Sequence, residues 1–318
     1  MEEQVDLRVD SEDSDIRLDV FLSARLGITR SSVKRLMSEG YIRIGGLEAK
    51  PALKVRPGMI VHVFNPSPAP VEETPQAQEI PVSIIFEDEY ILVVEKPAGM
   101  VVHPGAGNYT GTLVNALLYH APGMAGVGSP KRPGVVHRLD KLTSGVMVFA
   151  KTQYAYYTLA EAFKRHEHLR MYYALCYGEM PKEEGSIRTL LGRHPSDRKR
   201  MSSRVNKGRQ AITHWHVDRQ WKEFSLLRMR LETGRTHQIR VHLADMGRPV
   251  VGDPVYSGRK RANSIVDPLI RAHVKSLDRQ MLHAYLLGLR HPHTGKWIEF
   301  TSSMPQDMLS LINLLDRT

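Results

Sequence analysis

The feature that most constrains the fold of this chain is a proline-rich stretch in its N-terminal third. Residues 65–78 read NPSPAPVEETPQAQ and hold four prolines but few large apolar side chains. Such a segment is extended and cannot pack a core of its own. It therefore predicts a linker, assigned to residues 65–79, between a small domain at residues 17–64 and a large domain at residues 80–318.

Charge divides the chain in a similar way. Residues 1–16 carry one arginine and seven acidic residues, whereas residues 17–56 carry nine lysines and arginines against three acids. The whole chain has a formal net charge of +10. This distribution predicts an acidic N-terminal tail at residues 1–16, followed by two basic domains. A basic surplus favours a polyanionic partner.

Composition excludes several classes of protein. With 42% hydrophobic and 25% charged residues, the chain is neither mostly disordered nor fibrous. Its single cysteine, Cys176, allows no intramolecular disulfide, which favours a reducing compartment. The acidic N-terminus does not look like a signal peptide, and no apolar run approaches the roughly 18 residues of a membrane span. We expect a soluble, cytoplasmic protein that does not contact the membrane.

Hydrophobic periodicity predicts an α+β fold. Between Asp19 and Gly40 apolar residues recur every three or four positions, which predicts two helices broken at Gly27, with Thr29 capping the second. In the large domain, strand patterns outnumber helical ones and the connections vary in length, which favours α+β over a βα barrel. Strands are predicted at 41–44, 60–64, 82–86, 91–94, 145–150, 172–177 and 227–231, and helices at 112–121, 153–166, 236–246 and 306–315.

The segment at residues 134–145, GVVHRLDKLTSG, is the most unusual in the chain. Apolar residues on either side predict two buried strands with Asp140 on the loop between them. The nearby cations Arg138 and Lys141 favour an ionised Asp140, and a rigidly held carboxylate can act as a nucleophile or general base. The alternative interpretation is an ion pair between Arg138 and Asp140 that only closes the turn.

A second cluster lies at residues 233–243, which read TGRTHQIRVHL. Thr236 is expected to cap a helix in which Ile239 and Leu243 form an apolar i,i+4 pair. Four basic side chains gather around the start of this helix: Arg235, His237, Arg240 and His242. Free backbone N–H groups there also favour anions, so the cluster predicts a phosphate or carboxylate site. A solvated basic helix end is the alternative.

The rest of the sequence offers weaker signals. Residues 193–209 hold seven lysines and arginines against one aspartate and predict a basic loop between strands, either touching phosphates or merely solvated. The histidines show no HExxH spacing, one cysteine cannot build a cysteine-rich zinc site, and neither GxGxxG nor a phosphate-binding loop is present. We therefore expect no metal and no nucleotide cofactor.

Taken together, these motifs resemble those of the RluA/RluD-type pseudouridine synthases. The run VVHRLDK at 135–141 is similar to the central motif of that family, and PAGMVVHP at 97–104 to its KPxGxxVHP segment. RMYYALCYG at 170–178 and the 233–243 cluster with its tail GRPVVGDP, at 247–254, resemble two further motifs. Residues 17–64 resemble an S4 RNA-binding domain. The four catalytic-domain motifs stand in the order found in the family.

This resemblance implies a small S4-like domain, followed by a catalytic domain built on a mixed, mainly antiparallel sheet with a central cleft. The implied reaction isomerises uridine to pseudouridine in RNA without a metal or nucleotide cofactor. Asp140 matches the essential carboxylate, Tyr172 the aromatic residue that stacks on the uracil, and Arg240 the basic residue that pairs with Asp140. Whether Asp140 attacks the ribose or removes a proton from it stays open.

The chain departs from the family pattern at a few positions. Leu142 stands where an acidic residue is usual, and Arg170 where a lysine is usual. In the S4-like domain, Gly45 replaces a common asparagine and Met59 a common acid. These departures leave Asp140, Tyr172 and Arg240 intact, and they weaken only the inference of which uridine is chosen.

Basic residues of both domains are expected to contact RNA. In the S4-like domain five cations are expected to do so: Arg30, Lys34, Arg35, Lys54 and Arg56. In the catalytic domain we expect RNA contacts from His137, Arg138, Arg235 and His237. The leading hypothesis is a monomeric synthase acting on large-subunit (23S) ribosomal RNA, free or in an assembling particle. Action on tRNA or another RNA, and a non-catalytic RNA-binding assembly factor, are the alternatives.

Overall fold

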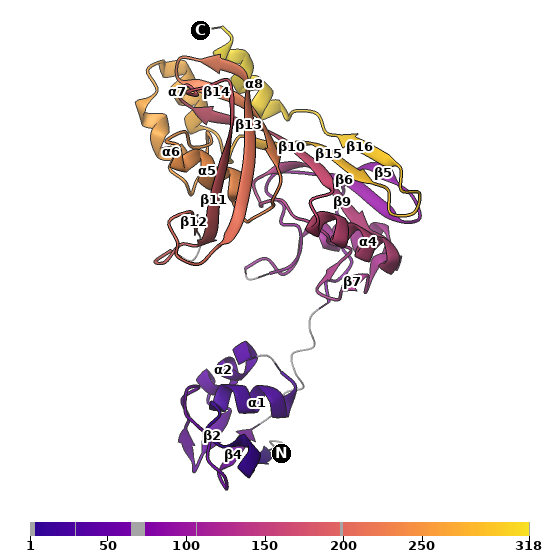
Figure 1. Cartoon of the computed structure of the whole chain (residues 1–318), viewed down its shortest axis with the longest axis vertical. Coiled ribbons are helices and arrows are strands. Elements are labelled where there is room, and N and C mark those ends of the chain that lie inside the picture. The colour runs from indigo at the N-terminus through magenta and orange to yellow at the C-terminus, as the bar shows by residue number, and fades with distance from the viewer. Residues whose placement is uncertain (1–3, 29, 65–73, 106, 198–199, 318) are drawn as a thin grey trace. The chain divides into compact units, whose positions relative to one another are not determined.

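The computed structural model describes residues 4–28, 30–64, 74–105, 107–197 and 200–317, without the side chains of residues 31, 32 and 35. The chain forms two compact units, Met1–Thr74 and Pro75–Thr318 (Figure 1). Most of the expected linker, residues 65–73, lies outside the described residues, as does Thr29, the expected helix cap.

The N-terminal unit joins two helices to a small antiparallel sheet. Helices α1 (Leu18–Leu26) and α2 (Arg30–Ser38) share a core with the strands, in which Phe21, Val33 and Val61 are fully buried or nearly so. Gly27 ends α1 in the left-handed conformation, at φ 66°, as the sequence predicted. The strands are β1 (Gln4–Arg8), β2 (Ile42–Ile44), β3 (Leu47–Glu48) and β4 (Ile60–Phe64), in the order β1-β4-β2-β3, with a short 3-10 helix η1 (Ser11–Asp13) after β1.

The N-terminal segment differs from the acidic tail that the charge pattern predicted. From Gln4 onward it is part of the sheet, because β1 pairs antiparallel with β4 and sets Val5 opposite Val63. The backbone N–H of Val9 then donates to the carbonyl of Met59 at 2.9 Å, and the Val9 side chain is buried. Alternating apolar residues at positions 5, 7 and 9 carried this strand signal beneath the acidic charge.

The C-terminal unit is built on one large sheet (Figure 1). Its ten strands run in the order β12-β11-β13-β14-β10-β15-β9-β6-β5, with β16 added beside β15. All pairings are antiparallel except that of β9 with β15. The strands are β5 (Ser83–Glu87), β6 (Ile91–Lys96), β9 (Ser144–Ala150), β10 (His168–Tyr177), β11 (Glu184–Arg193), β12 (Met201–Ser202), β13 (Arg209–Trp221), β14 (Phe224–Leu231), β15 (Leu282–Arg290) and β16 (Trp297–Thr301). This mixed, mainly antiparallel α+β architecture is the one expected.

Helices pack beside this sheet. They are α3 (Leu113–His120), α4 (Gln153–Lys164), α5 (Gln238–Asp245), α6 (Gly258–Arg261), α7 (Pro268–Lys275) and α8 (Gln306–Leu315), with the 3-10 turns η2 (Pro122–Met124) and η3 (Ala262–Ser264). The hairpin of β7 (Gly128–Ser129) and β8 (Arg132–Pro133) forms a separate small sheet. None of the helices in the described ranges combines the length and the hydropathy needed to span a membrane.

The strand that follows the Asp140 loop lies at the centre of the core. Every residue of β9 is buried, and β6 flanks it on one side and β15 on the other. At its start Gly145 adopts φ 126°, and a Cβ at this position would overlap the backbone carbonyl of Ala284 in β15. Only glycine lets the two backbones approach this closely. Gly145 therefore fixes where the Asp140 loop meets β15.

Replacing this glycine tests the close approach. Gly145→Ala is expected to lower the free energy of unfolding by about 3 kcal/mol or more, because it adds a backbone clash to an unfavourable φ. Urea unfolding measures the change. The matched control is Gly123→Ala in η2, where a Cβ meets nothing within 4 Å and φ is not positive. Equal stabilities for the two variants would contradict the assigned role of Gly145.

Candidate active site

Asp140 lies on the loop that leads into β9 and meets a basic residue of α5. The Nη1 atom of Arg240 donates to Oδ2 of Asp140 at 2.9 Å, and the Asp140 side chain is 17% exposed. The two residues are a hundred positions apart in the sequence. The structure thus brings together the carboxylate and the basic residue that the two separate motifs supplied.

Arg240 has a second carboxylate partner, Asp253. Asp253 is fully buried and receives Nε of Arg240 at 2.7 Å and Nη2 at 3.0 Å, a forked pairing that fixes the plane of the guanidinium. The same carboxylate accepts the backbone N–H groups of Val255 and Tyr256. Sequence reasoning missed Asp253, although the segment GRPVVGDP that contains it had been singled out. Its partner could not be inferred from spacing.

His237 begins α5 in a strained conformation beside Asp140. It is the N-cap of the helix, at φ 58°, and this corrects the prediction that Thr236 caps α5. Its Nδ1 lies 2.9 Å from the hydroxyl of Tyr256, and its Nε2 lies 3.9 Å from Oδ2 of Asp140. Left-handed non-glycine residues are costly and gather at functional sites. The structure therefore places this predicted RNA contact next to the carboxylate.

Electrostatics keep Asp140 ionised. Burial alone would raise the pKa of its carboxyl group, but the charges of His237, Arg240 and Arg138, together with the Arg240 hydrogen bond, hold the pKa below its ordinary value. Because burial lowers the pKa of His237, the guanidinium groups are the permanent part of this effect. At neutral pH Asp140 is therefore a carboxylate, as nucleophilic or basic catalysis requires.

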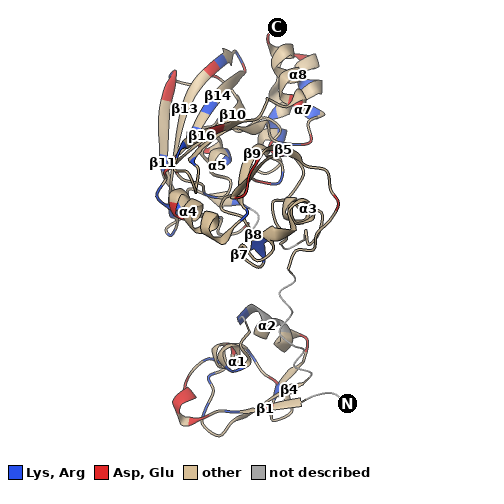
Figure 2. Ribbon diagram, turned by 90° about the vertical axis from the view of Figure 1, so that its right-hand side faces the viewer, with Lys and Arg blue, Asp and Glu red and all other residues tan. Residues whose placement is uncertain are grey.

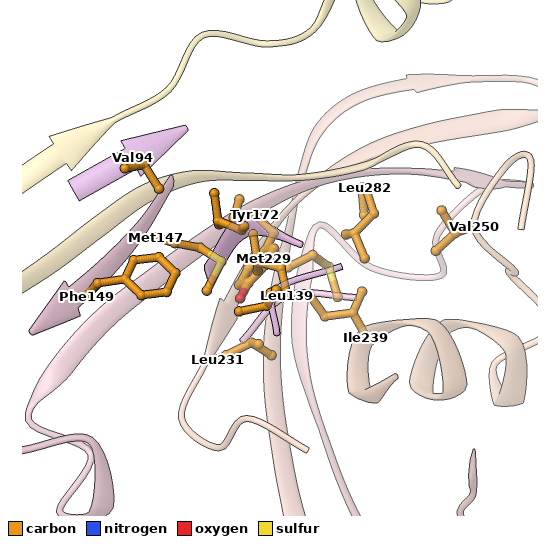
Figure 3. Packing of buried hydrophobic residues seen from close by; sticks show 14 of the residues in the cluster. Val94, Leu139, Met147, Phe149, Tyr172, Met229, Leu231, Ile239, Val250 and Leu282 are labelled. Atoms are coloured by element: carbon orange, nitrogen blue, oxygen red, sulfur yellow. The ribbon is translucent and has the colours of Figure 1, made fainter. Parts of the chain in front are cut away.

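Tyr172 lies in β10, with Met229 of β14 on one side and Ala284 of β15 on the other. Its side chain is almost fully buried in the hydrophobic cluster that also holds Leu139 (Figure 3). Leu139 directly precedes Asp140 in the sequence. Burial raises the pKa of its hydroxyl, so the ring is neutral. Tyr172, Asp140 and Arg240 line one pocket, so the three residues predicted to be catalytic converge.

The remaining predicted RNA contacts of this unit differ in placement. Arg138 is exposed and lines the same pocket, and Arg235 lines it while donating from Nε to the carbonyl of Gln210 at 3.0 Å. The side chain of His137 instead contacts other parts of the protein. Its Nε2 accepts the N–H of Val148 at 3.1 Å, and its ring stacks on Phe163 with centroids 4.8 Å apart. These contacts tie the His137 ring to the fold, which differs from the RNA-facing position expected.

Lys96 supports the Asp140 loop from inside the protein. Its fully buried ammonium group donates to the carbonyls of Pro97, Met100 and Lys141 at 2.7, 2.8 and 3.1 Å. The N–H of Gly99 donates to the same Lys141 carbonyl at 2.8 Å. The residue directly after Asp140 is thus held by two donors. Sequence reasoning missed this lysine, which precedes the segment 97–104.

The donor set of the site suits organic acid–base chemistry. Within the described ranges, no group of three or more His, Cys, Asp and Glu side chains is placed to hold a metal ion. Cys176 is buried in β10, and burial raises the pKa of its thiol to about 12, so it acts as a core residue. The polar groups that line the pocket include the Asp140 carboxylate, the Tyr172 side chain and the neighbouring cations.

The Asp253 pairing is tested by removing its charge. Asp253→Asn leaves the buried Arg240 with one carboxylate partner and is expected to cost about 3 kcal/mol of stability. Turnover should fall roughly tenfold to a hundredfold, because the guanidinium that orients Asp140 becomes loose. Thermal unfolding and initial rates measure the two effects. The control is Asp245→Asn, an exposed aspartate on the same helix as Arg240; if both variants behaved alike, Asp253 would have no special role.

Known proteins resemble this chain over most of its length. The family model for RNA pseudouridylate synthase matches residues 90–245, and the S4 domain model matches residues 16–61. The chain is 44% identical over 306 residues to a protein of Zymomonas mobilis named ribosomal large subunit pseudouridine synthase D, covering 94% of this chain and 93% of that one. An uncharacterized RNA pseudouridine synthase of Aquifex aeolicus is 41% identical, with 99% and 98% covered.

A solved structure shares the fold of the catalytic unit. The human RNA pseudouridylate synthase domain containing 1 superposes with a TM-score of 0.54 at 24% identity, covering 76% of this chain and 97% of that one. The motifs around Asp140, Tyr172 and Arg240, the sheet that carries them and the extent of the identity lead to one conclusion. The chain belongs to the RNA pseudouridylate synthase family and carries an S4 domain at its N-terminal end.

Proposed function

We propose that this enzyme converts uridine to pseudouridine in the RNA of the large ribosomal subunit. The observation that carries the proposal is the Asp140 carboxylate, held ionised by Arg240 in the same pocket as the Tyr172 ring. The substrate class is supported by the printed name of relatives such as the Zymomonas protein. We further propose that the enzyme acts in the cytoplasm as a monomer.

The reaction changes bonds but not composition. The bond between C1′ of the ribose and N1 of uracil breaks, the detached base turns, and C1′ joins C5, which loses its proton as N1 gains one. Asp140 starts the process by attacking C1′, in an ester bond that breaks when C5 joins C1′, or by removing a proton from C2′ that returns to C2′ after C5 has joined C1′. Throughout, the base must be held in place, and the Tyr172 ring offers a stacking surface for it. A buried, neutral aromatic ring and a rigid carboxylate suit this task.

The target nucleotide must leave its helix to reach Asp140, which costs a few kcal/mol. A wider cleft shares Asp140, Arg138 and Arg240 with the pocket, and Arg132 and Lys141 also line it. Phosphate contacts with these cations offset the cost of flipping. Basic residues also lie on strands farther away, β13 and β14 among them (Figure 2).

The S4 domain supplies a second basic surface. Buried Asp19 accepts hydrogen bonds from Arg17 and Arg30, and the backbone of Arg17 forms a β-bridge with that of Lys54. Asp19 thereby holds Arg17, the residue before α1, close to Arg30 of α2, and the β-bridge sets the backbone of Lys54, in the loop before β4, beside that of Arg17. Lys34 and Arg56 are exposed, whereas the side chain of Arg35 lies outside what the structure describes. We propose that Arg30, Lys34, Arg35, Lys54 and Arg56 dock RNA.

The substrate is tested by mapping the modified positions. Unmodified transcripts of the large-subunit RNA and of tRNA are incubated with the enzyme, and pseudouridines are located by carbodiimide treatment and primer extension. We expect modification at discrete positions of the large-subunit RNA and none in tRNA. The same positions should revert to uridine in a deletion strain. Modification confined to tRNA, or none in either RNA, would refute the proposal.

The role of the carboxylate is tested separately. Asp140→Asn keeps the side-chain volume but removes the nucleophile or base, so turnover should fall below detection. Release of tritium from RNA labelled at C5 of uracil measures it. Unchanged thermal unfolding and retained RNA binding serve as controls for folding. Appreciable turnover in this variant would remove the carboxylate from the mechanism.

Removing the S4 domain tests its docking role. A chain that begins at Pro75 keeps the carbonyl of Gln76 and the N–H of Gln78, both of which bond Asn115 of α3, and is expected to fold. It should bind structured RNA more weakly and with a shallower dependence on salt, because phosphate contacts are lost. Turnover of a saturating short hairpin should be nearly intact. Unchanged affinity and salt slope would show that the domain does not dock RNA.

A further inference from the structure

One buried cation in the active-site pocket lacks a counterion. Arg170 is 7% exposed and lines the same pocket as Asp140 and Tyr172. In the part of the chain that the structure describes, its guanidinium has no hydrogen-bond acceptor or carboxylate, and its Nε atom is buried without a partner. Its central carbon lies 5.8 Å from the ring centroid of Phe163, a contact that does not neutralise the charge.

The other buried arginines of the C-terminal unit are paired. Arg240 bonds Asp253 and Asp140, and Arg279 forms a forked pair with Asp307. An unpaired buried charge costs several kcal/mol, which a fold does not retain without compensation. The contrast suggests that the partner of Arg170 is not part of the protein.

The groups around Arg170 do not supply that partner. Burial lowers its pKa, the nearby Tyr172 hydroxyl opposes this, and Arg235 lowers it further. Burial and, in addition, the charge of Arg170 lower the pKa of the His137 and His168 rings. These neighbours are neutral or positive, so an electron-rich oxygen entering the pocket would meet an uncompensated donor.

The backbone leaves space for this guanidinium. A Cβ on Gly234 would overlap Nη1 of Arg170, although φ at Gly234 lies outside the left-handed region. The absence of a side chain on Gly234 thus leaves room for the guanidinium in its present position. Along β10, residues two apart share a face of the sheet, which sets Arg170 beside Tyr172. The guanidinium therefore lies on the same face of the sheet as the Tyr172 ring, on which a uracil would stack.

We propose that Arg170 is a positioning residue that donates hydrogen bonds to an oxygen of the flipped nucleotide. The oxygen is a carbonyl of the uracil or a non-bridging oxygen of the adjoining phosphate, since a guanidinium fork suits both. This inference rests on the proposed function, because it takes the pocket to be the uridine site. It assigns a role to the position where the sequence departs from the lysine usual in the family.

The test measures binding apart from turnover. In the Asp140→Asn background, Arg170→Met and Arg170→Lys are compared using two RNA hairpins that differ at one loop position, which is a uridine or an abasic ribose. The control is Arg230→Met. Arg230 lies on β14 opposite Met171 and is exposed, and alternation along the strands sets it on the other face from Tyr172.

Arg170→Met should weaken binding of the uridine hairpin by about tenfold or more, and Arg170→Lys by less, because lysine keeps the charge but not the fork. Arg230→Met should leave the preference for uridine over the abasic ribose unchanged. If the acceptor is a uracil carbonyl, the abasic hairpin should bind with equal affinity to Arg170→Met and to the protein that keeps Arg170. If it is a phosphate, both hairpins lose affinity and the salt slope falls by about one.

Unchanged affinity of folded Arg170→Met and Arg170→Lys for both hairpins would overturn the inference and leave Arg170 a structural cation. Should the methionine variant fail to fold, the lysine variant decides, since the loss of the fork must still weaken uridine binding. Failure of the proposed function is distinguishable, because it appears as wild-type enzyme that makes no pseudouridine in the large-subunit RNA. The hairpin measurements do not depend on turnover.

Discussion

The site depends on the forked ion pair between Asp253 and Arg240. Because Asp253 bonds both Nε and Nη2 of Arg240, the plane of the guanidinium is fixed. Its third nitrogen, Nη1, then points at Asp140. The charge that keeps Asp140 ionised is therefore also the group that orients it. Because Asp253 in turn accepts the backbone N–H groups of Val255 and Tyr256, the orientation of the Asp140 carboxylate depends on the main chain at these two residues. Side-chain flexibility contributes little to it.

Sequence alone identified the residues that line the pocket better than the residues that hold them in place. Asp140, Tyr172 and Arg240 lie in motifs whose residue types suggest chemistry, and the structure brings them into one pocket. Asp253 and Lys96 act through side-chain contacts that form only when the chain folds, and neither periodicity nor spacing encodes such contacts. In the sequence, an aspartate that forms a buried ion pair with a residue thirteen positions away cannot be told from any other aspartate.

Two predictions from the sequence, the acidic tail at residues 1–16 and the helix cap at Thr236, were wrong for local reasons. The charge of residues 1–16 hid the alternation that forms β1, because charged residues, Asp6 and Arg8, occupy the positions between the apolar ones. Thr236 has the side chain of a good cap, but the helix begins one residue later, where His237 adopts a left-handed conformation that its contacts with Tyr256 and Asp140 accompany. Propensity favoured threonine, whereas the tertiary contacts of the histidine determined the boundary.

The parallel pairing of β9 with β15 bears on how the enzyme is made. The Ser144 end of β9 is seated against His283 and Ala284, so the reactive loop gains its support from residues near the C-terminus. During synthesis the chain grows from its N-terminal end, and the S4 domain can complete its own small core long before β15 leaves the ribosome. A nascent chain can thus complete the core of its S4 domain well before the strand that supports the Asp140 loop has been made.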